Sequence, residues 1–297
     1  MRLFNVAGKL LLRPILEIGC IVVMTLEARA SDAPERVEGE LPVSVALSLS
    51  YVSKILSYGL PDSDDPNLLF DGGLVFLDMI SVGSRTYMDT TDIGVQMGRG
   101  NRRGDIWEVD FPVDVRHAFK QQEFEWLPTS VELGGGYRYE YHPKRTDIED
   151  TQFWLSDLAF PDLWLVPRLQ YERDFVRDNG TYVNIRLSHA FTFFETISLE
   201  PSVSQGWGDE KRVRGYLPSP DMKGRLDHSG LMDTLFCVAI TWQITPALSL
   251  SGFVGYSDFL FDRKIRDASR NYIRQSDGVS RGRSWRFPAG IALSCVW

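Results

Sequence analysis

The feature that most constrains this chain is an alternation of apolar and polar residues that recurs along most of its length. The stretch 43–51 alternates Val, Val, Leu, Leu and Tyr with serines and an alanine. The stretch 107–115 alternates Trp, Val, Phe, Val and Val with Glu, Asp and Pro. A period of two places successive side chains on opposite faces of a β-strand. Because no sustained helical period accompanies it, the sequence predicts an all-β protein.

The alternating stretches are too long for an ordinary soluble sandwich. They run for about 10–14 residues, whereas ordinary strands average about 5–6 residues and a tilted membrane-spanning strand needs about 9–11. One face carries charged and small residues, and the other is almost wholly aliphatic and aromatic. The 25 glycines and the 12% aromatic content are also typical of outer-membrane barrels. We therefore expect a transmembrane antiparallel up-and-down β-barrel of about 12 strands.

Aromatic residues gather near the ends of the expected strands, where rings of a barrel lie at headgroup depth. The expected aromatic belts are Trp107, Tyr139, Tyr141, Trp207, Tyr256 and Trp285 at one rim, and Phe191, Phe193, Trp242 and Trp297 at the other.

Connection lengths give the expected topology, because bacterial barrels have short periplasmic turns and long outer loops. Long polar connections alternate with short ones, which places both chain termini on the periplasmic side. The expected strands are 42–53, 67–77, 80–90, 105–117, 128–142, 150–160, 163–174, 181–193, 197–207, 232–244, 248–257 and 284–297.

The first thirty residues are expected to be an export signal. Basic residues precede a short apolar stretch, and Ala28-Arg29-Ala30 provides a cleavage site after Ala30. A short buried or anchoring helix is the alternative. Residues 31–41 would then form a short periplasmic segment and 42–297 the barrel, which predicts localisation in the outer membrane of a Gram-negative-type bacterium. Cys237 and Cys295 fall on non-adjacent strands and are expected to be free thiols.

The C-terminal stretch ends on an aromatic residue. Ala289, Ile291, Leu293 and Cys295 alternate with small residues before Trp297. This pattern resembles the C-terminal signature that the barrel assembly machinery recognises, so this machinery is an expected partner through Trp297.

The N-terminal part also carries a family resemblance. It reads Tyr51-Val52-Ser53, Tyr58-Gly59, then Pro66 after an acidic loop, and Gly72-Gly73 in the returning strand. This resembles the opening of the TorF-like family of outer-membrane porins. The resemblance implies a channel-like barrel of unspecified solute and supplies no catalytic residues.

Charged residues on the polar face are the candidate functional residues. Charges facing lipid would cost several kcal/mol near the midplane, so we expect these to line the lumen. A hydrated mixed-charge pore for small polar solutes or ions would use them to orient the solute, whereas a filled barrel would use them only as salt bridges. The expected pore-lining residues are Arg85, Glu108, Asp110, Asp114, Arg116, Glu132, Arg138, Glu140, Arg168, Glu172, Arg186, Glu200 and Arg286.

Two alternatives to a pore stay open. Basic residues in the long loops 208–231 and 258–283 could bind phosphates of lipopolysaccharide, which together with outer-membrane lipid is an expected partner. They could equally fold into the barrel as a constriction. An acyl hydrolase could use His228 beside Ser229, although sequence neighbours need not form a catalytic pair. Neither a cofactor nor a metal site is predicted, because no phosphate-binding, dinucleotide or zinc spacing is present. The formal net charge of −8 argues against a nucleic-acid partner.

Overall fold

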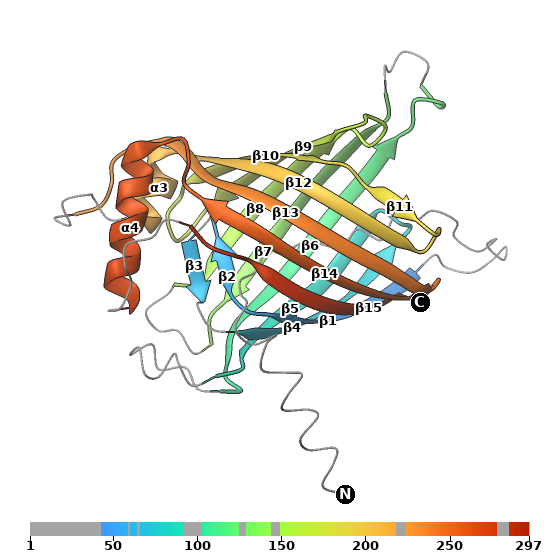
Figure 1. Ribbon diagram of the computed structural model, residues 1–297, viewed down its shortest axis with the longest axis horizontal. Helices are drawn as coiled ribbons and strands as arrows, with labels where there is room; N and C mark the ends of the chain where they lie inside the picture. The colour runs from blue at the N-terminus through green and yellow to red at the C-terminus, as the bar shows by residue number, and fades with distance from the viewer. Residues whose placement is uncertain are drawn as a thin grey trace, which may run out of the picture.

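The protein is a closed antiparallel β-barrel with short turns at one end and long loops at the other (Figure 1). The computed structural model describes residues 43–58, 60–63, 66–91, 103–124, 129–143, 149–217, 224–277 and 285–296. The expected signal peptide, the expected periplasmic segment and Trp297 lie outside these residues.

Twelve barrel strands confirm the expected number, and each matches an expected strand to within a few residues. The eighth barrel strand has two pieces, β10 and β11, which both pair with β12. The strands are β1 (Val43–Val52), β4 (Asn67–Phe76), β5 (Ile80–Asp89), β6 (Ile106–Phe119), β7 (Val131–Tyr141), β8 (Thr151–Ala159), β9 (Val166–Asp174), β10 (Thr181–Ser188) with β11 (Phe191–Phe193), β12 (Ile197–Gly208), β13 (Gly230–Thr245), β14 (Leu248–Asp258) and β15 (Ala289–Val296). The last strand is shorter than expected, because the regular ladder begins only at Ala289.

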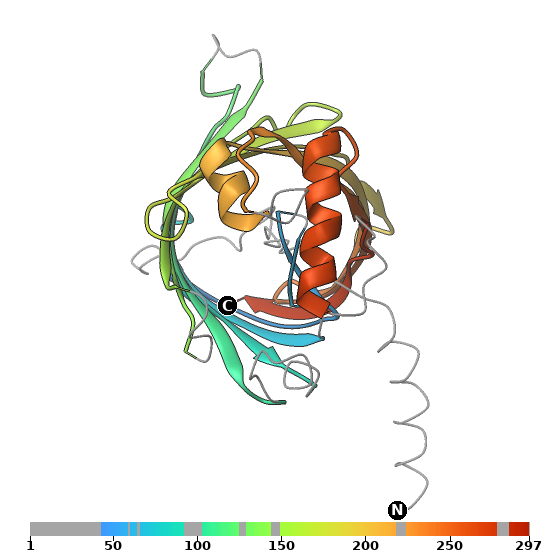
Figure 2. The ribbon, with the colours of Figure 1, turned by 90° about the vertical axis from the view of Figure 1, so that its left-hand side faces the viewer.

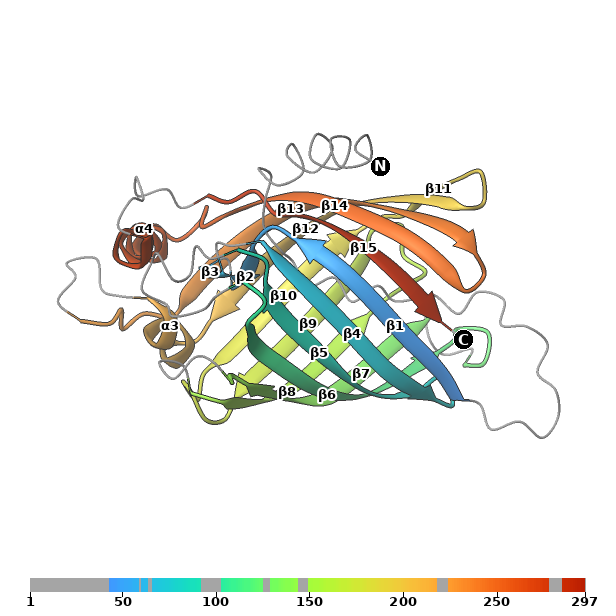
Figure 3. The same ribbon diagram turned by 90° about the horizontal axis from the view of Figure 1, so that it is seen from below.

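Closure comes from the pairing of the first strand with the last. β1 pairs with β15 from Ala46 opposite Val296 to Val52 opposite Gly290, as seen from below in Figure 3. The short turns gather at the same end as Val43 and Val296. Two of these turns place consecutive non-glycine residues at positive φ, Leu77-Asp78 and Phe194-Glu195, as the two central residues of a type I′ turn require. We call this end the turn end and the opposite one the loop end.

The two faces of the wall differ as the alternation predicts. Along β1, the apolar residues Val43, Val45, Leu47 and Leu49 are exposed, and the serines and alanine between them are half-buried. The apolar residues therefore form an outer surface suited to lipid.

Trp107 is the clear exception to the expected aromatic belt, and that prediction is wrong. Its side chain is buried and its indole Nε1 donates a 2.8 Å hydrogen bond to Asn67. A break in register between β5 and β6 pairs Tyr87 with Glu108 and Met88 with Ile106, so Trp107 is the extra residue. A β-bulge of this kind turns a side chain to the other face of the sheet.

The loop end contains structure that the alternation did not predict. A short hairpin, β2 (Ile55–Ser57) with β3 (Leu60–Ser63), follows β1, and helices α3 (Glu210–Tyr216) and α4 (Arg263–Asp277) lie across the barrel end (Figure 2). A buried cluster joins these helices to β13 through Val213, Leu217, Met232, Phe259, Ile265 and Ala268. Neither described helix has the length and apolar character needed to cross a bilayer.

Substitutions on opposite faces of one strand test which face is directed toward lipid and which toward the lumen. Replacing the outward Leu47 by Arg should lower the free energy of unfolding by about 2–4 kcal/mol, because a charge near the bilayer midplane is poorly solvated. Replacing the neighbouring inward Ala46 by Arg should cost less than about 1 kcal/mol. Reversible chemical denaturation in lipid vesicles would measure both values, and equal costs would contradict the assignment of faces.

Candidate functional site

The inner face of the barrel carries a continuous row of directly opposed residues. From β14 to β7 it runs through Ser249, Ser294, Ser48, Asp71, Arg85, Asp110 and Glu140. Residues opposite each other in a ladder share a face, so this row shows that the inner wall changes from small to charged side chains. The small wall is formed by β14, β15 and β1, and the charged wall by β4 to β12.

Side chains on the charged wall are joined in ion pairs. Arg85 pairs with Asp71, and Arg186 Nη2 lies 2.7 Å from Glu200 Oε1. Asp157 accepts from Arg168 at 3.0 Å and lies 3.4 Å from Arg116 on β6, with β7 between their strands. This ion pair passes over Gly134 of β7, which is directly opposite both residues and has no side chain to block it, so all three share one face of the sheet.

The small wall remains accessible to solvent although it faces inward. Ser44, Ser48 and Ser50 of β1 are half-buried, as are Ser249 and Ser251 of β14. The hydroxyls of Ser48 and Ser294 are 2.9 Å apart, so the wall is also polar. A filled lumen would bury these residues completely. Their partial exposure indicates water-accessible space beside the small wall.

The lumen is much more closely packed at the loop end. Arg212 of α3 is completely buried there, with Nη2 3.2 Å from Glu172 and Nη1 3.4 Å from Asp178. Its guanidinium lies 4.5 Å from the ring centre of Tyr58, which the β2–β3 hairpin carries inward. Tyr58 also donates a hydrogen bond to Glu172. The two loops thus meet on the inner wall and narrow the lumen.

The position of α3 depends on a close backbone approach. Asp209 caps the helix by accepting a 2.8 Å hydrogen bond from the backbone N–H of Arg212. A Cβ atom added at Gly180 would lie 2.4 Å from that same backbone nitrogen. Only glycine therefore lets the β9–β10 turn approach the helix closely enough for Asp178 to reach the Arg212 guanidinium.

Burial controls protonation in this narrowed region. It raises the pKa of Tyr58 well above its ordinary value, although the nearby Arg212 acts in the opposite direction, so Tyr58 remains a neutral donor. Burial also raises the pKa of Asp178 to about 6, against the lowering effect of Arg212.

Some of the expected pore-lining residues lie on the accessible part of the charged wall, and others lie in the narrowed region at the loop end. Those in ion pairs on the accessible part of the charged wall are Arg85, Arg116, Glu132, Arg168, Arg186 and Glu200. Glu108, Asp110, Arg138, Glu140 and Glu172 lie toward the loop end, where Arg138 bridges Glu140 at 3.0 Å and Glu172 at 3.2 Å. Asp114 is half-buried on β6. Their role in permeation stays a prediction.

Arg286 does not lie in a strand, contrary to expectation. It forms an isolated bridge to Ser257 before β15 begins, and its guanidinium donates to the carbonyl of Trp285 at 2.7 Å.

Several residues of the narrowed region were not anticipated as part of an inner site. Tyr58, Trp107 and Tyr182 had no candidate role inside the barrel, and Asp178 was placed in an ordinary turn. Arg212 belongs to one of the basic loops for which lipopolysaccharide binding and folding into the barrel are both open, and the structure places it inside the barrel. No pattern in the sequence indicates which loop residues fold back into a barrel.

The geometry around His228 gives the hydrolase alternative no support. His228 Nε2 lies 2.8 Å from Asp262 Oδ2, whereas Ser229 is exposed. Asp262 also accepts hydrogen bonds from the backbone N–H groups of Lys264 and Ile265 at the start of α4. Burial tends to raise the pKa of Asp262, but the hydrogen bond with His228 and, to a smaller extent, the two backbone hydrogen bonds lower it below its ordinary value. The pair therefore anchors α4 to β13.

Both remaining cysteines, Cys237 and Cys295, are free, as expected.

Comparison with known proteins gives structural neighbours only. No family model matches the chain, so the TorF-like resemblance remains a prediction. No curated protein matches it either. An outer membrane channel from Pseudomonas putida F1 is 10% identical, with a TM-score of 0.45 over 90% of this chain and 100% of that chain. The KdgM porin is 10% identical, with a TM-score of 0.44 over 84% of this chain and 97% of that chain. The NanC porin is also 10% identical, with a TM-score of 0.44 over 86% of this chain and 98% of that chain.

The raised pKa of Asp178 has a measurable effect on stability. Its folded-state pKa of about 6 exceeds the ordinary value of 3.8, so the folded state holds this proton more tightly than the unfolded state. The free energy of unfolding should therefore decrease as the pH rises from about 4 to about 6, by at most about 3 kcal/mol. Asp178→Asn should lack this contribution. Chemical denaturation of both proteins at several pH values measures this effect. A difference in free energy of unfolding that does not change with pH would contradict the raised pKa of Asp178.

Proposed function

We propose that the protein is a non-enzymatic outer-membrane channel for passive diffusion of small polar solutes or ions. The observation that carries this proposal is the accessible small wall facing a wall of paired charges inside a closed barrel. A structural barrel filled by side chains would be expected to bury both walls. Water beside a mixed-charge surface gives polar solutes a path and an orienting transverse field.

The proposed channel is narrowest at the loop end. There Arg212 and Tyr58 project from two different loops onto Glu172 of β9. A constriction made by loop residues can exclude large solutes while leaving the strands unchanged. In the outer membrane, the long loops would face outward and the short turns the periplasm.

Single-channel recording in planar bilayers tests the proposal directly. The refolded protein, checked for folding by heat-dependent gel migration, should show stable stepwise conductance. A folded protein that never conducts would contradict the channel function.

Charge substitutions on the accessible part of the lumen should change ion selectivity. Replacing Asp114, Glu132 and Glu200 by their amides removes three negative charges from the inner wall, so cation permeability relative to anion permeability should fall roughly twofold or more. The matched control, Arg116→Gln with Arg186→Gln, should shift the ratio toward cations. Reversal potentials in a salt gradient measure both changes, and identical potentials in all variants would exclude these residues from the conduction path.

The constriction should depend on Arg212 and not on its neighbours in α3. Arg212→Ala removes the buried guanidinium and leaves Glu172 and Asp178 facing the lumen, so conductance should rise roughly twofold or more and favour cations. Arg214→Ala removes a half-exposed Arg of the same helix and should leave conductance unchanged. Equal conductance in the two variants would show that the path avoids Arg212.

A surface-binding role is the second candidate, supported by basic side chains at the loop end. The side chains of Arg263 and Arg214 are 87% and 48% exposed. We propose that they contact lipopolysaccharide phosphates. A silent but folded barrel that binds lipopolysaccharide through these residues would make this the principal function.

A further inference from the structure

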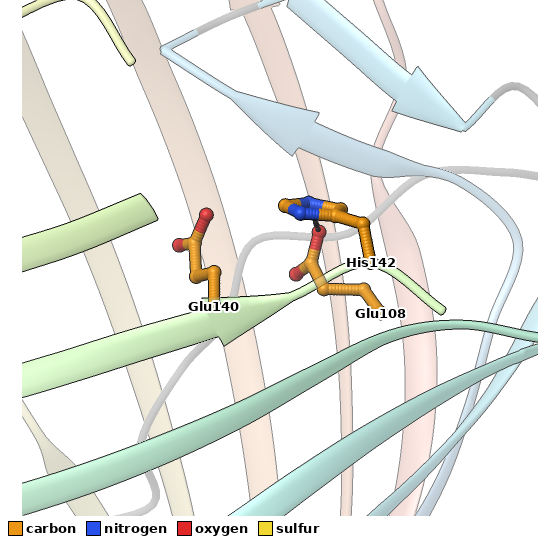
Figure 4. Close-up of side chains that lie close together, drawn as sticks. All are labelled: Glu108, Glu140 and His142. Atoms are coloured by element: carbon orange, nitrogen blue, oxygen red, sulfur yellow. Dashed lines mark hydrogen bonds and ion pairs between the residues drawn. The ribbon is translucent and has the colours of Figure 1, made fainter. Parts of the chain in front are cut away.

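A compact group of possible metal ligands lies on the inner wall near the loop end. Glu108 belongs to β6, Glu140 to β7, and His142 follows β7 directly (Figure 4). One ligand atom from each side chain lies within 4.8 Å of the other two. His142 Nε2 and Glu108 Oε2 are 3.2 Å apart. Glu108 and His142 are buried, and Glu140 is half-buried.

The ladder concentrates negative charge at this place. Asp110 is directly opposite Glu140, so two carboxylates share adjacent positions on one face. Like charges in directly opposed positions destabilise a sheet. Arg138 is the guanidinium beside Glu140, but it is shared with Glu172.

Asp110 adds an independent indication that a cation is needed. Its side chain is only 2% exposed, and its Oδ1 atom has no hydrogen-bond partner within the described part of the chain. Its other oxygen accepts a 3.2 Å hydrogen bond from Tyr87. An unsatisfied buried carboxylate oxygen is costly unless a proton or a cation neutralises it.

The orientation of His142 also suits a metal ligand. Its backbone N–H donates a 2.9 Å hydrogen bond to Asp150, and the same carboxylate oxygen lies 3.7 Å from ring atom Nδ1. This leaves Nε2 directed toward Glu108. The distance from Asp150 to Nδ1 is longer than a hydrogen bond, but a carboxylate on that side of the ring is where the outer support of a metal-bound imidazole usually lies.

We propose that Glu108, Glu140 and His142 bind one divalent transition-metal cation of the Zn²⁺ class, with Asp110 as a possible additional oxygen donor. An imidazole with carboxylates is a ligand set that Zn²⁺ accepts at about 2.0–2.2 Å. Ligand atoms around a tetrahedral ion then lie about 3.4 Å apart. Small rotations of the two glutamate side chains bring the present group to that spacing. The ion would enter from the lumen water.

Metal binding to the refolded full chain, without a histidine tag, tests this proposal without any measurement of current. After treatment with a chelator, titration calorimetry with ZnCl₂ and elemental analysis should show one Zn²⁺ per folded barrel. Co²⁺ should give a visible absorption band that Zn²⁺ abolishes. Absence of binding by the folded wild-type protein would overturn the proposal, whatever its conductance.

Binding measurements on variants test whether the ion is bound by these three residues. His142→Ala and Glu108→Gln should each weaken binding by at least tenfold. Asp150→Asn keeps all three proposed ligands and should weaken binding by about tenfold or more through loss of ring orientation. The controls His117→Ala and Glu132→Gln, toward the turn end of β6 and β7, should bind as tightly as wild type. Unchanged affinity in folded His142→Ala and Asp150→Asn would show that the ion binds elsewhere.

Discussion

Every other property of this protein depends on the hydrogen bonds that join its first and last strands. An unpaired strand edge in lipid would expose backbone N–H and C=O groups without water to satisfy them. The ladder from β1 to β15 removes both edges at once. Once the barrel is closed, alternate side chains of each strand point to opposite faces, and each strand must direct its apolar residues outward. The charged residues then face inward and determine what the interior can do.

Closure with twelve strands leaves an interior of intermediate size. The accessible part of this interior and the part at the loop end are packed differently. Beside the small wall of β14, β15 and β1, half-buried serines leave the lumen accessible. Toward the loop end, the β2–β3 hairpin and α3 fold inward, and a single buried guanidinium binds both to the wall. The bulge that turns Trp107 inward belongs to the same packed half, since its ring lies 5.4 Å from that of Tyr87.

The barrel could be predicted from the sequence because alternation is a property of each strand alone. The inward charges followed for the same reason. The alternation of β8 is weak, but this strand could still be expected because a barrel of this class has an even number of strands. The packed loop end could not be predicted, because it depends on contacts between segments distant in sequence. Tyr58 meets Glu172, 114 positions away, and Arg212 meets Glu172 from the other side. Likewise, the proximity of Glu108 to His142 follows from strand register, with no ligand spacing to reveal it.

Two neighbouring groups of carboxylates at the loop end have their negative charge balanced in different ways. Glu172 and Asp178 are buried, and the chain places Arg212 directly between them. Beside them on β6 and β7, the carboxylates of Glu108, Asp110 and Glu140 lie close to His142 and to Arg138, which is shared with Glu172, and Arg85 is directly opposite Asp110. The first group obtains its cation from α3. The second shares its two arginines with other carboxylates, Arg138 with Glu172 and Arg85 with Asp71, and is close enough to the lumen to take a cation from water. Electrostatic balance at the narrowest part of the barrel thus links the fold of the loops to the ionic composition of the lumen.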